Sequence, residues 1–164
     1  MVSKKVQRLF LEAVEDLGTQ SDGFSSLDDL LESFDLPYGK ALLEDRFIRA
    51  AVWNLSKESP WSDDYKGFLL QVKPGASARY LVGALANPVQ RVAALEVLFK
   101  YGPSRVTVGP LVGALASPEH VDVASDVLIS FGQAALRFIR QPFPGSKLYE
   151  PLTTVIRMIN AKAA

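Results

Sequence analysis

The chain has 164 residues, the size of one ordinary domain, and 48% of them are hydrophobic, which is enough to bury a core and excludes a disordered chain. Its 18 lysines and arginines balance 18 aspartates and glutamates, so the chain lacks the overall basic excess on which non-specific nucleic-acid binding depends. The absence of cysteine excludes disulfides, thiol catalysis and cysteine-ligated zinc.

The sequence predicts a cytoplasmic location. The start of the chain is basic, but Glu12, Glu15 and Asp16 interrupt the apolar stretch that a signal peptide requires. No window approaches the roughly 18 consecutive apolar residues of a membrane-spanning helix. We therefore expect no membrane partner.

The first 38 residues are expected to form an N-terminal helical cap. An amphipathic stripe stops at Gly18, and a second, short helix opens at Ser26 and ends near Phe34. The apolar residues of the stripe are Val6, Phe10, Ala13, Val14 and Leu17.

Residues 39–80 are interpreted as a degenerate two-helix repeat. Apolar residues at helical spacing predict the first helix over 39–57, and Ser62-Asp63-Asp64 is the expected cap of a second helix over 63–72. The apolar positions of the first helix are Leu43, Phe47, Ala51, Val52 and Leu55.

Residues 81–140 contain two clear copies of one unit. A gapless comparison of 81–110 with 111–140 gives eleven identical positions, beginning with LVGALANP against LVGALASP. The other identities fall at helix-like spacings and end with Gly102 and Gly132. A repeat at a fixed offset of thirty residues indicates a repeat architecture.

Each copy is predicted to form two helices. In the second copy the first helix covers about 104–116, with Val108, Leu111, Val112 and Leu115 along one face. The glycine in LVGAL is expected to let neighbouring helices pack closely.

The second helix of each copy is predicted over about 88–101 and 118–131. Asn87 and Ser117 are the expected N-caps, each followed by proline, and a glycine in the left-handed conformation ends each helix. The small residues Ala94 and Ala124 lie in the middle of these helices, where two helices could approach closely.

Residues 141–164 are expected to form a C-terminal capping helix. Pro142, Pro144 and Gly145 interrupt the chain before a helix over about 150–161, which has Pro151 in its first turn.

The pattern of proline, alanine, leucine and glycine in 81–132 resembles the bacterial HEAT-like repeats of the phycobilisome-lyase type, in the armadillo-like helical superfamily. The first copy keeps Pro88, Arg91, Ala93, Ala94, Leu98 and Gly102, whereas the second has Val121 at the arginine position. This resemblance implies an all-α fold, a right-handed α-solenoid of two-helix repeats with degenerate helical caps at both ends. We expect residues 1–164 to form a single domain.

No catalytic, cofactor or metal site is predicted. His120, the only histidine, aligns with Gln90 in the other copy, so a polar or packing role is the simpler interpretation than general-base chemistry. Neither an HExxH pair nor a glycine-rich phosphate loop occurs. Trp53 and Trp61, with Arg49 and Lys57, could stack on nucleic-acid bases, but Trp53 is expected in the core.

Two features of the second helices are candidate interaction sites. Glu119, Asp122 and Asp126, with Glu96 as counterpart of Asp126, form either a solvated face or a weakly acidic groove on the concave side that the family implies. An apolar strip contains Val92, Leu95 and Phe99, with Ile129 in the next copy; either the N-terminal helices or a partner helix cover it. The candidate partner-binding residues are Val92, Glu96, Phe99, Lys100, Asp122, Asp126 and Ile129.

We expect a non-catalytic protein–protein interaction module, an adaptor, regulator or inhibitor, whose partner is another protein. Two alternatives remain open: a nucleic-acid-binding HEAT-like protein of the DNA glycosylase type, and a lyase or chaperone for a chromophore protein. We do not expect a nucleic-acid partner, because the predicted groove is acidic.

Overall fold

The computed structural model describes residues 45, 47–55 and 62–163, and these residues form an all-α structure without a strand. Asp45 and residues 47–53 are helical, and we call them the 45–53 helix. The other helices, in chain order, are α4 (Ser62–Gln71), α5 (Pro74–Ala84), α6 (Pro88–Tyr101), α7 (Arg105–Ala114), α8 (Val121–Phe131), α9 (Gln133–Leu136) and α10 (Tyr149–Ala163). The predicted N-terminal cap, residues 1–38, lies outside the described residues.

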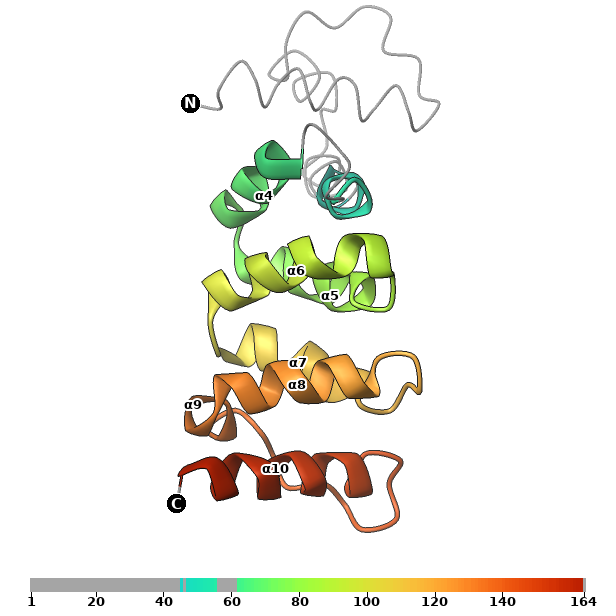
Figure 1. Ribbon diagram of the computed structural model, residues 1–164, viewed down its shortest axis with the longest axis vertical. Helices are drawn as coiled ribbons and strands as arrows, with labels where there is room; N and C mark the ends of the chain where they lie inside the picture. Colours follow the sequence, from blue (N-terminus) through green and yellow to red (C-terminus); the bar gives the residue numbers. More distant parts are fainter. Residues whose placement is uncertain (1–44, 46, 56–61, 164) are drawn as a thin grey trace, which may run out of the picture.

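The helices follow one another in pairs along the long axis of the molecule (Figure 1). Helix α5 packs against α6 within one pair, and α7 packs against α8 within the next. The two pairs are joined mainly by α5 and α7, which contact each other more extensively than any other two of these helices. Helix α4 packs on α6 at one end, and α10 packs on α8 and α9 at the other.

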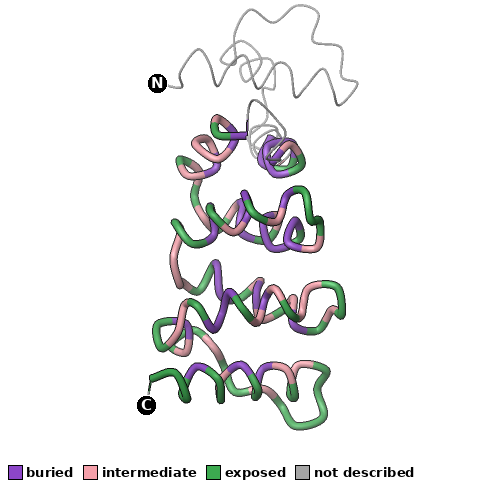
Figure 2. The backbone as a smooth tube through the Cα atoms, in the orientation of Figure 1, coloured by how far each residue is buried: buried purple, intermediate pink, exposed green. Residues whose placement is uncertain are grey.

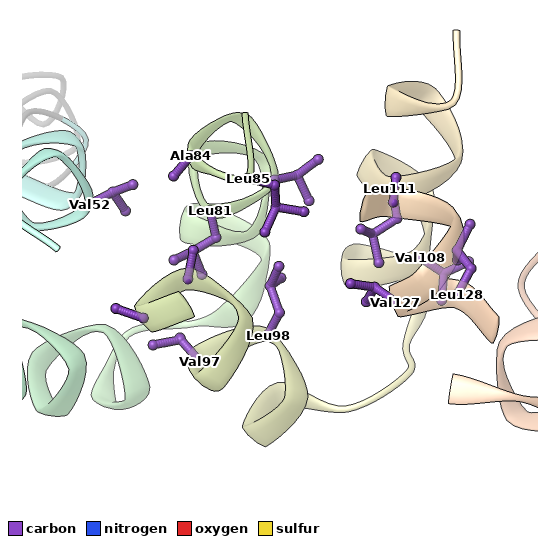
Figure 3. Close-up of a cluster of buried hydrophobic side chains, with 14 of the residues drawn as sticks. Val52, Leu81, Ala84, Leu85, Val97, Leu98, Val108, Leu111, Val127 and Leu128 are labelled. Atoms are coloured by element: carbon purple, nitrogen blue, oxygen red, sulfur yellow. The ribbon is translucent and has the colours of Figure 1, made fainter. Parts of the chain in front are cut away.

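One continuous hydrophobic core runs through these layers. Figure 3 shows Leu81, Leu85, Val97 and Leu98 on α5, α6 and the turn between them, with Val108, Leu111, Val127 and Leu128 on the next pair. All eight side chains are almost completely buried, and buried residues occur in every layer of Figure 2. Because burial of one leucine or valine is worth about 1.5–3 kcal/mol, contacts of this kind dominate the stability of the stack.

The turns within the two pairs repeat the same backbone hydrogen bonds thirty residues apart. The N–H of Asn87 donates to the carbonyl of Ala84 at 3.1 Å, and the N–H of Ser117 donates to the carbonyl of Ala114 at 3.0 Å. Gly102 and Gly132, which end the two second helices, have φ angles of 68° and 60°. Glycine stops with positive φ are therefore confirmed, but ψ angles of 178° and −145° place both glycines outside the left-handed helical conformation that was predicted. The sequence repeat corresponds to a repeat of local structure.

A hydrogen bond between layers repeats with the same period. The Gln90 side-chain amide on α6 donates to the backbone carbonyl of Trp53, and His120 Nε2, just before α8, lies 3.3 Å from the carbonyl of Gly83. Each bond joins the start of a second helix to the end of the first helix one layer earlier. The 45–53 helix thus has the same relation to α6 that α5 has to α8.

Tyr101 connects three helices at the opposite end of α6. Its hydroxyl donates to the carbonyl of Leu69 on α4 and lies 2.8 Å from the hydroxyl oxygen of Ser77 on α5, which is buried. Burial raises the pKa of Tyr101, and the hydrogen bond with Ser77 partly opposes this effect. The half-buried phenol therefore links α4, α5 and α6 at the edge of the core.

Most predicted helices lie within two residues of the observed ones. Three differences occur among the described residues: α8 starts later than predicted, the helix predicted over 39–57 ends at residue 53, and the short helix α9 was not predicted. Residues 39–44, 46, 56 and 57 of the predicted first helix lie outside the described residues.

Asn87 caps α6 as expected, since its side-chain oxygen accepts the N–H of Val89 at 3.0 Å. The prediction that Ser117 is the cap of a helix starting at 118 is wrong, because the Ser117 hydroxyl lies 3.1 Å from His120 Nδ1 instead and α8 begins at Val121. The Ser117 hydroxyl pairs with the His120 ring and does not cap the backbone of α8.

The expected role of the LVGAL glycines is also wrong. A Cβ added at Gly83 or Gly113 meets nothing within 4 Å, so neither glycine is needed for close packing of neighbouring helices. The buried small residues are instead Ala94 and Ala124, whose side chains belong to the core. The exposed glycines lower helix propensity without any packing gain among the described residues.

The C-terminal end of the stack is amphipathic. Helix α10 buries Leu152, Val155 and Ile159 and leaves Thr154 and Arg157 exposed. The loop before it contains a turn in which the Ser146 N–H donates to the Phe143 carbonyl at 3.1 Å, with Pro144 second and Gly145 at φ 84° third. This is the geometry of a type II turn, so the predicted chain break before the last helix is confirmed.

Alanine should have opposite effects on stability at a helical glycine and at a glycine with positive φ. Gly113→Ala should raise the free energy of unfolding by about 0.5–1 kcal/mol, because helix propensity improves and the added methyl group meets nothing. Gly132→Ala should lower it by about 1–3 kcal/mol, because the residue must keep a positive φ. Urea denaturation measures both. Destabilisation by Gly113→Ala would mean that something packs on this face.

Candidate functional site

Six of the residues predicted to bind a partner lie exposed on the second helices α6 and α8, and we call this region the α6–α8 surface. The two helices occupy equivalent places in successive layers (Figure 1). The surface comprises Val92, Glu96, Phe99 and Lys100 on α6 with Asp122 and Asp126 on α8.

The predicted apolar strip is exposed on α6 but not on α8. Phe99 is 46% exposed, and its ring meets Phe131 edge-to-face with 5.7 Å between ring centroids. Ile129, thirty residues after Phe99, is only 7% exposed and belongs to the core on a helix that α9 and α10 both contact. We therefore leave Ile129 out of the α6–α8 surface. Val92 is exposed, so two side chains of this strip, Val92 and Phe99, face solvent.

The carboxylates on this surface differ in their partners. Lys66 on α4 lies 2.7 Å from Glu96 and 2.7 Å from Asp63, and these hydrogen bonds raise the pKa of Lys66. Asp122 and Asp126 form no ion pair with any described residue. The surface thus combines exposed apolar groups with two carboxylates that have no cation partner among the described residues.

His120 performs a structural role at the edge of this surface. Both of its ring nitrogens lie within hydrogen-bond distance of described groups, Nδ1 of the Ser117 hydroxyl and Nε2 of the Gly83 carbonyl. The neutral tautomer with hydrogen on Nε2 satisfies both bonds, since Nε2 then donates and Nδ1 accepts. These contacts agree with the polar packing role predicted from its alignment with Gln90.

A polar cluster on the first helices was not predicted from the sequence. The Asp45 carboxylate is 2.7 Å from Arg79 Nη2, 3.0 Å from Arg49 Nε, and accepts a hydrogen bond from the Tyr80 hydroxyl. Arg49 and Arg79 also lie over the Tyr80 ring, at 5.1 and 4.5 Å from its centroid. The only sequence indication was the thirty-residue spacing of the two arginines.

Hydrogen bonding holds Asp45 in its ionised form. The hydrogen bond from Tyr80 is the largest contribution that lowers the pKa of Asp45; partial burial opposes it, and Arg79 adds to it. Beside this carboxylate an open cavity of about 700 Å³ is lined by Asp45, Ile48, Gln71, Val72, Lys73, Gly75, Ala76 and Arg79. The cavity therefore has two cations and one anion on its walls.

The expectation that Trp53 belongs to the core is wrong. Its side chain is 77% exposed, although its backbone carbonyl accepts the hydrogen bond from Gln90. The 45–53 helix buries Ile48, Ala51, Val52 and the following Leu55, and Trp53 projects from the side that carries Arg49 one turn earlier. Trp61 and Lys57 lie outside the described residues.

No group of histidine and acidic residues suited to a metal ion occurs in residues 45, 47–55 and 62–163. None of the helices in this part of the chain combines the length and apolarity needed to cross a membrane. Comparison of the sequence and structure with models of known protein families, with curated proteins and with solved structures found no match.

Aspartate substitutions at Phe99 and Ile129 should have very different costs. Ile129→Asp places a carboxylate in the core and should lower the free energy of unfolding by roughly 3–5 kcal/mol. Phe99→Asp loses mainly the edge-on contact with Phe131 and should cost about 1 kcal/mol. Chemical denaturation distinguishes them, and equal large costs would show that Phe99 is also internal.

The Asp45 cluster predicts a pH-dependent effect of Asp45→Asn. Because folding lowers the pKa of Asp45, its stabilisation is complete above the unfolded pKa of about 3.9 and is lost as the pH falls below it. The stability difference between the wild type and Asp45→Asn should therefore shrink between pH 7 and pH 3, as followed by urea denaturation. The control Asp126→Asn, at an unpaired carboxylate, should give a small difference at both values.

Proposed function

We propose that this protein is a non-catalytic protein-binding module, an adaptor, regulator or inhibitor, which binds a partner protein through the α6–α8 surface. In this proposal the chain is a right-handed α-solenoid of HEAT-like two-helix repeats, and the partner lies along its second helices in the cytoplasm. The observation that carries the proposal is the exposure of Val92 and Phe99 on the same surface as Asp122 and Asp126, which form no ion pair within residues 45, 47–55 and 62–163.

The apolar half of this surface supports binding energetically. Phe99 keeps nearly half of its surface in water, whereas Ala94, Val97 and Leu98 of the same helix are packed into the core. Large exposed apolar side chains grouped together mark interaction sites more often than isolated ones do. A partner that covers Phe99 and Val92 removes their apolar surface from water, and this removal favours binding.

The charged half supports selectivity. Asp122 replaces Val92 and Asp126 replaces Glu96 at equivalent positions of the next layer, so apolar and acidic groups alternate over a short distance. Carboxylates at the edge of an interface select partners with complementary charge and accelerate their association. A segment with apolar residues flanked by lysine or arginine fits this arrangement.

The repeat geometry supports an extended binding surface. The hydrogen bonds of Gln90 and His120 fix consecutive layers in the same relation, thirty residues apart. Stacked repeats of this kind present their second helices side by side and so form continuous surfaces for macromolecules. His120 contributes to this stacking, which is why we assign it no chemical step.

The proposal is tested by affinity capture from extracts of the native host with two matched variants. Phe99→Asp introduces a charge into the α6–α8 surface, whereas Val106→Asp introduces the same charge on α7 at a residue of similar exposure, 44%. We expect proteins captured by the wild type to be retained by Val106→Asp and lost by Phe99→Asp, with both variants folded by circular dichroism. Capture that is unchanged in Phe99→Asp would contradict the proposal.

A further inference from the structure

A second exposed surface, formed by the first helices, has the opposite charge. Arg49 and Trp53 lie one turn apart on the 45–53 helix, and Arg79 and Lys73 lie on α5 and just before it. We call these four residues the Arg49–Arg79 patch. Asp45 is the only acidic residue that pairs with it among the described residues, and within these residues the patch has a positive excess.

The geometry of this patch is well defined. Arg49 and Arg79 occupy equivalent positions in successive layers, and both are held over the ring of Tyr80 and against Asp45. Side chains that are already ordered lose less entropy when they bind a partner. Trp53 adds a large, 77% exposed aromatic surface beside them.

The composition of the patch fits a protein partner. Tryptophan, tyrosine and arginine are the residues most enriched among those that dominate the binding energy of protein interfaces. The positive excess requires an acidic partner, and the indole requires an apolar group to cover it. Both requirements are met on this chain by the α6–α8 surface, with its unpaired Asp122 and Asp126 beside Val92 and Phe99.

We propose that the Arg49–Arg79 patch of one molecule binds the α6–α8 surface of a second copy of this chain. The inference rests on the proposed function, because it names one protein partner for that same surface. The patch lies on first helices and the α6–α8 surface on second helices, which stand in front of α5 and α7 in Figure 1. Self-association through these two surfaces is therefore intermolecular.

Two further properties of the chain favour this association. Its formal net charge is zero, so copies do not repel one another at neutral pH. Its charges are nevertheless unevenly distributed. The patch has three cations against Asp45, whereas the α6–α8 surface has three carboxylates, one of them paired with Lys66, against Lys100. This difference orients two copies patch to surface. Because the two surfaces differ, the contact is heterologous, and it generates rings or open chains rather than one closed symmetric dimer.

Sedimentation velocity of the full chain tests the proposal first. We expect the weight-average sedimentation coefficient to rise with protein concentration and to fall when salt is added. Trp53→Ser should weaken self-association at least about tenfold, as expected for a dominant interface residue, without a loss of stability, because the side chain is exposed and the carbonyl bond to Gln90 is retained. A monomer at every concentration and salt overturns the inference.

A charge-exchange pair then tests which surfaces meet. Arg49→Glu with Arg79→Glu makes the patch acidic, and Asp122→Lys with Asp126→Lys makes the α6–α8 surface basic. Each double variant should be monomeric alone, whereas an equimolar mixture should associate again, because each copy then meets a surface of opposite charge. If the mixture remains monomeric while both variants are folded, the two surfaces do not bind each other.

Basic and aromatic groups together can also bind single-stranded nucleic acid. Binding of a labelled single-stranded oligonucleotide therefore tests this alternative to self-association. Binding of the oligonucleotide that Trp53→Ser abolishes, without self-association of the wild type, overturns our inference in favour of a nucleic-acid site. Failure of self-association leaves the proposed function testable on its own, since host proteins captured by the wild type and lost by Phe99→Asp do not depend on a second copy.

Discussion

The side chains of Leu81, Leu98 and Leu111 are fully buried. A single pair of helices is too small to cover such side chains on all sides. The missing cover comes from the next pair, chiefly through α5 against α7, and at the two ends through α4 and α10. Each layer thus depends on its neighbours for the burial that stabilises it. The interlayer hydrogen bonds of Gln90 and His120 add direction to this packing, because they fix which end of a first helix meets the following second helix.

Because neighbouring layers bury each other's core residues, the residues on the outer faces of successive layers can differ in type and exposure. Phe99 and Ile129 occupy equivalent positions, yet one is half exposed and the other is internal, because α9 and α10 pack on α8. Trp53 and Gly83 are a second such pair, with a tryptophan and a glycine at the same exposed place. One scaffold therefore carries an acidic, apolar surface on its second helices and a basic, aromatic patch on its first, and our functional proposals rest on these two regions.

The sequence predicted those features that depend on local chemistry and periodicity. The bounds of α6 follow from Asn87, Pro88 and Gly102, and the all-α class and the repeat follow from identities at helical spacing. Contacts between residues about thirty positions apart could not be predicted from local pattern: the side chain of Trp53, the Asp45–Tyr80 cluster and the burial of Ile129 depend on what the neighbouring layer places beside them. The open space around Gly83 could not be predicted for the same reason. A single glycine in a helix is compatible both with a close neighbouring helix and with no neighbour at all.

An engineered disulfide between layers tests whether helix pairs thirty residues apart stack in register. A Cβ at Gly75 on α5 would lie 3.9 Å from the Cβ of Val106 on α7, within the range of natural disulfides, and the chain has no other cysteine. Gly75→Cys with Val106→Cys should form an intramolecular disulfide under mild oxidation, seen as a reducible mobility shift. Two free thiols in the folded, oxidised protein, or a bond only between molecules, would contradict the stacked arrangement.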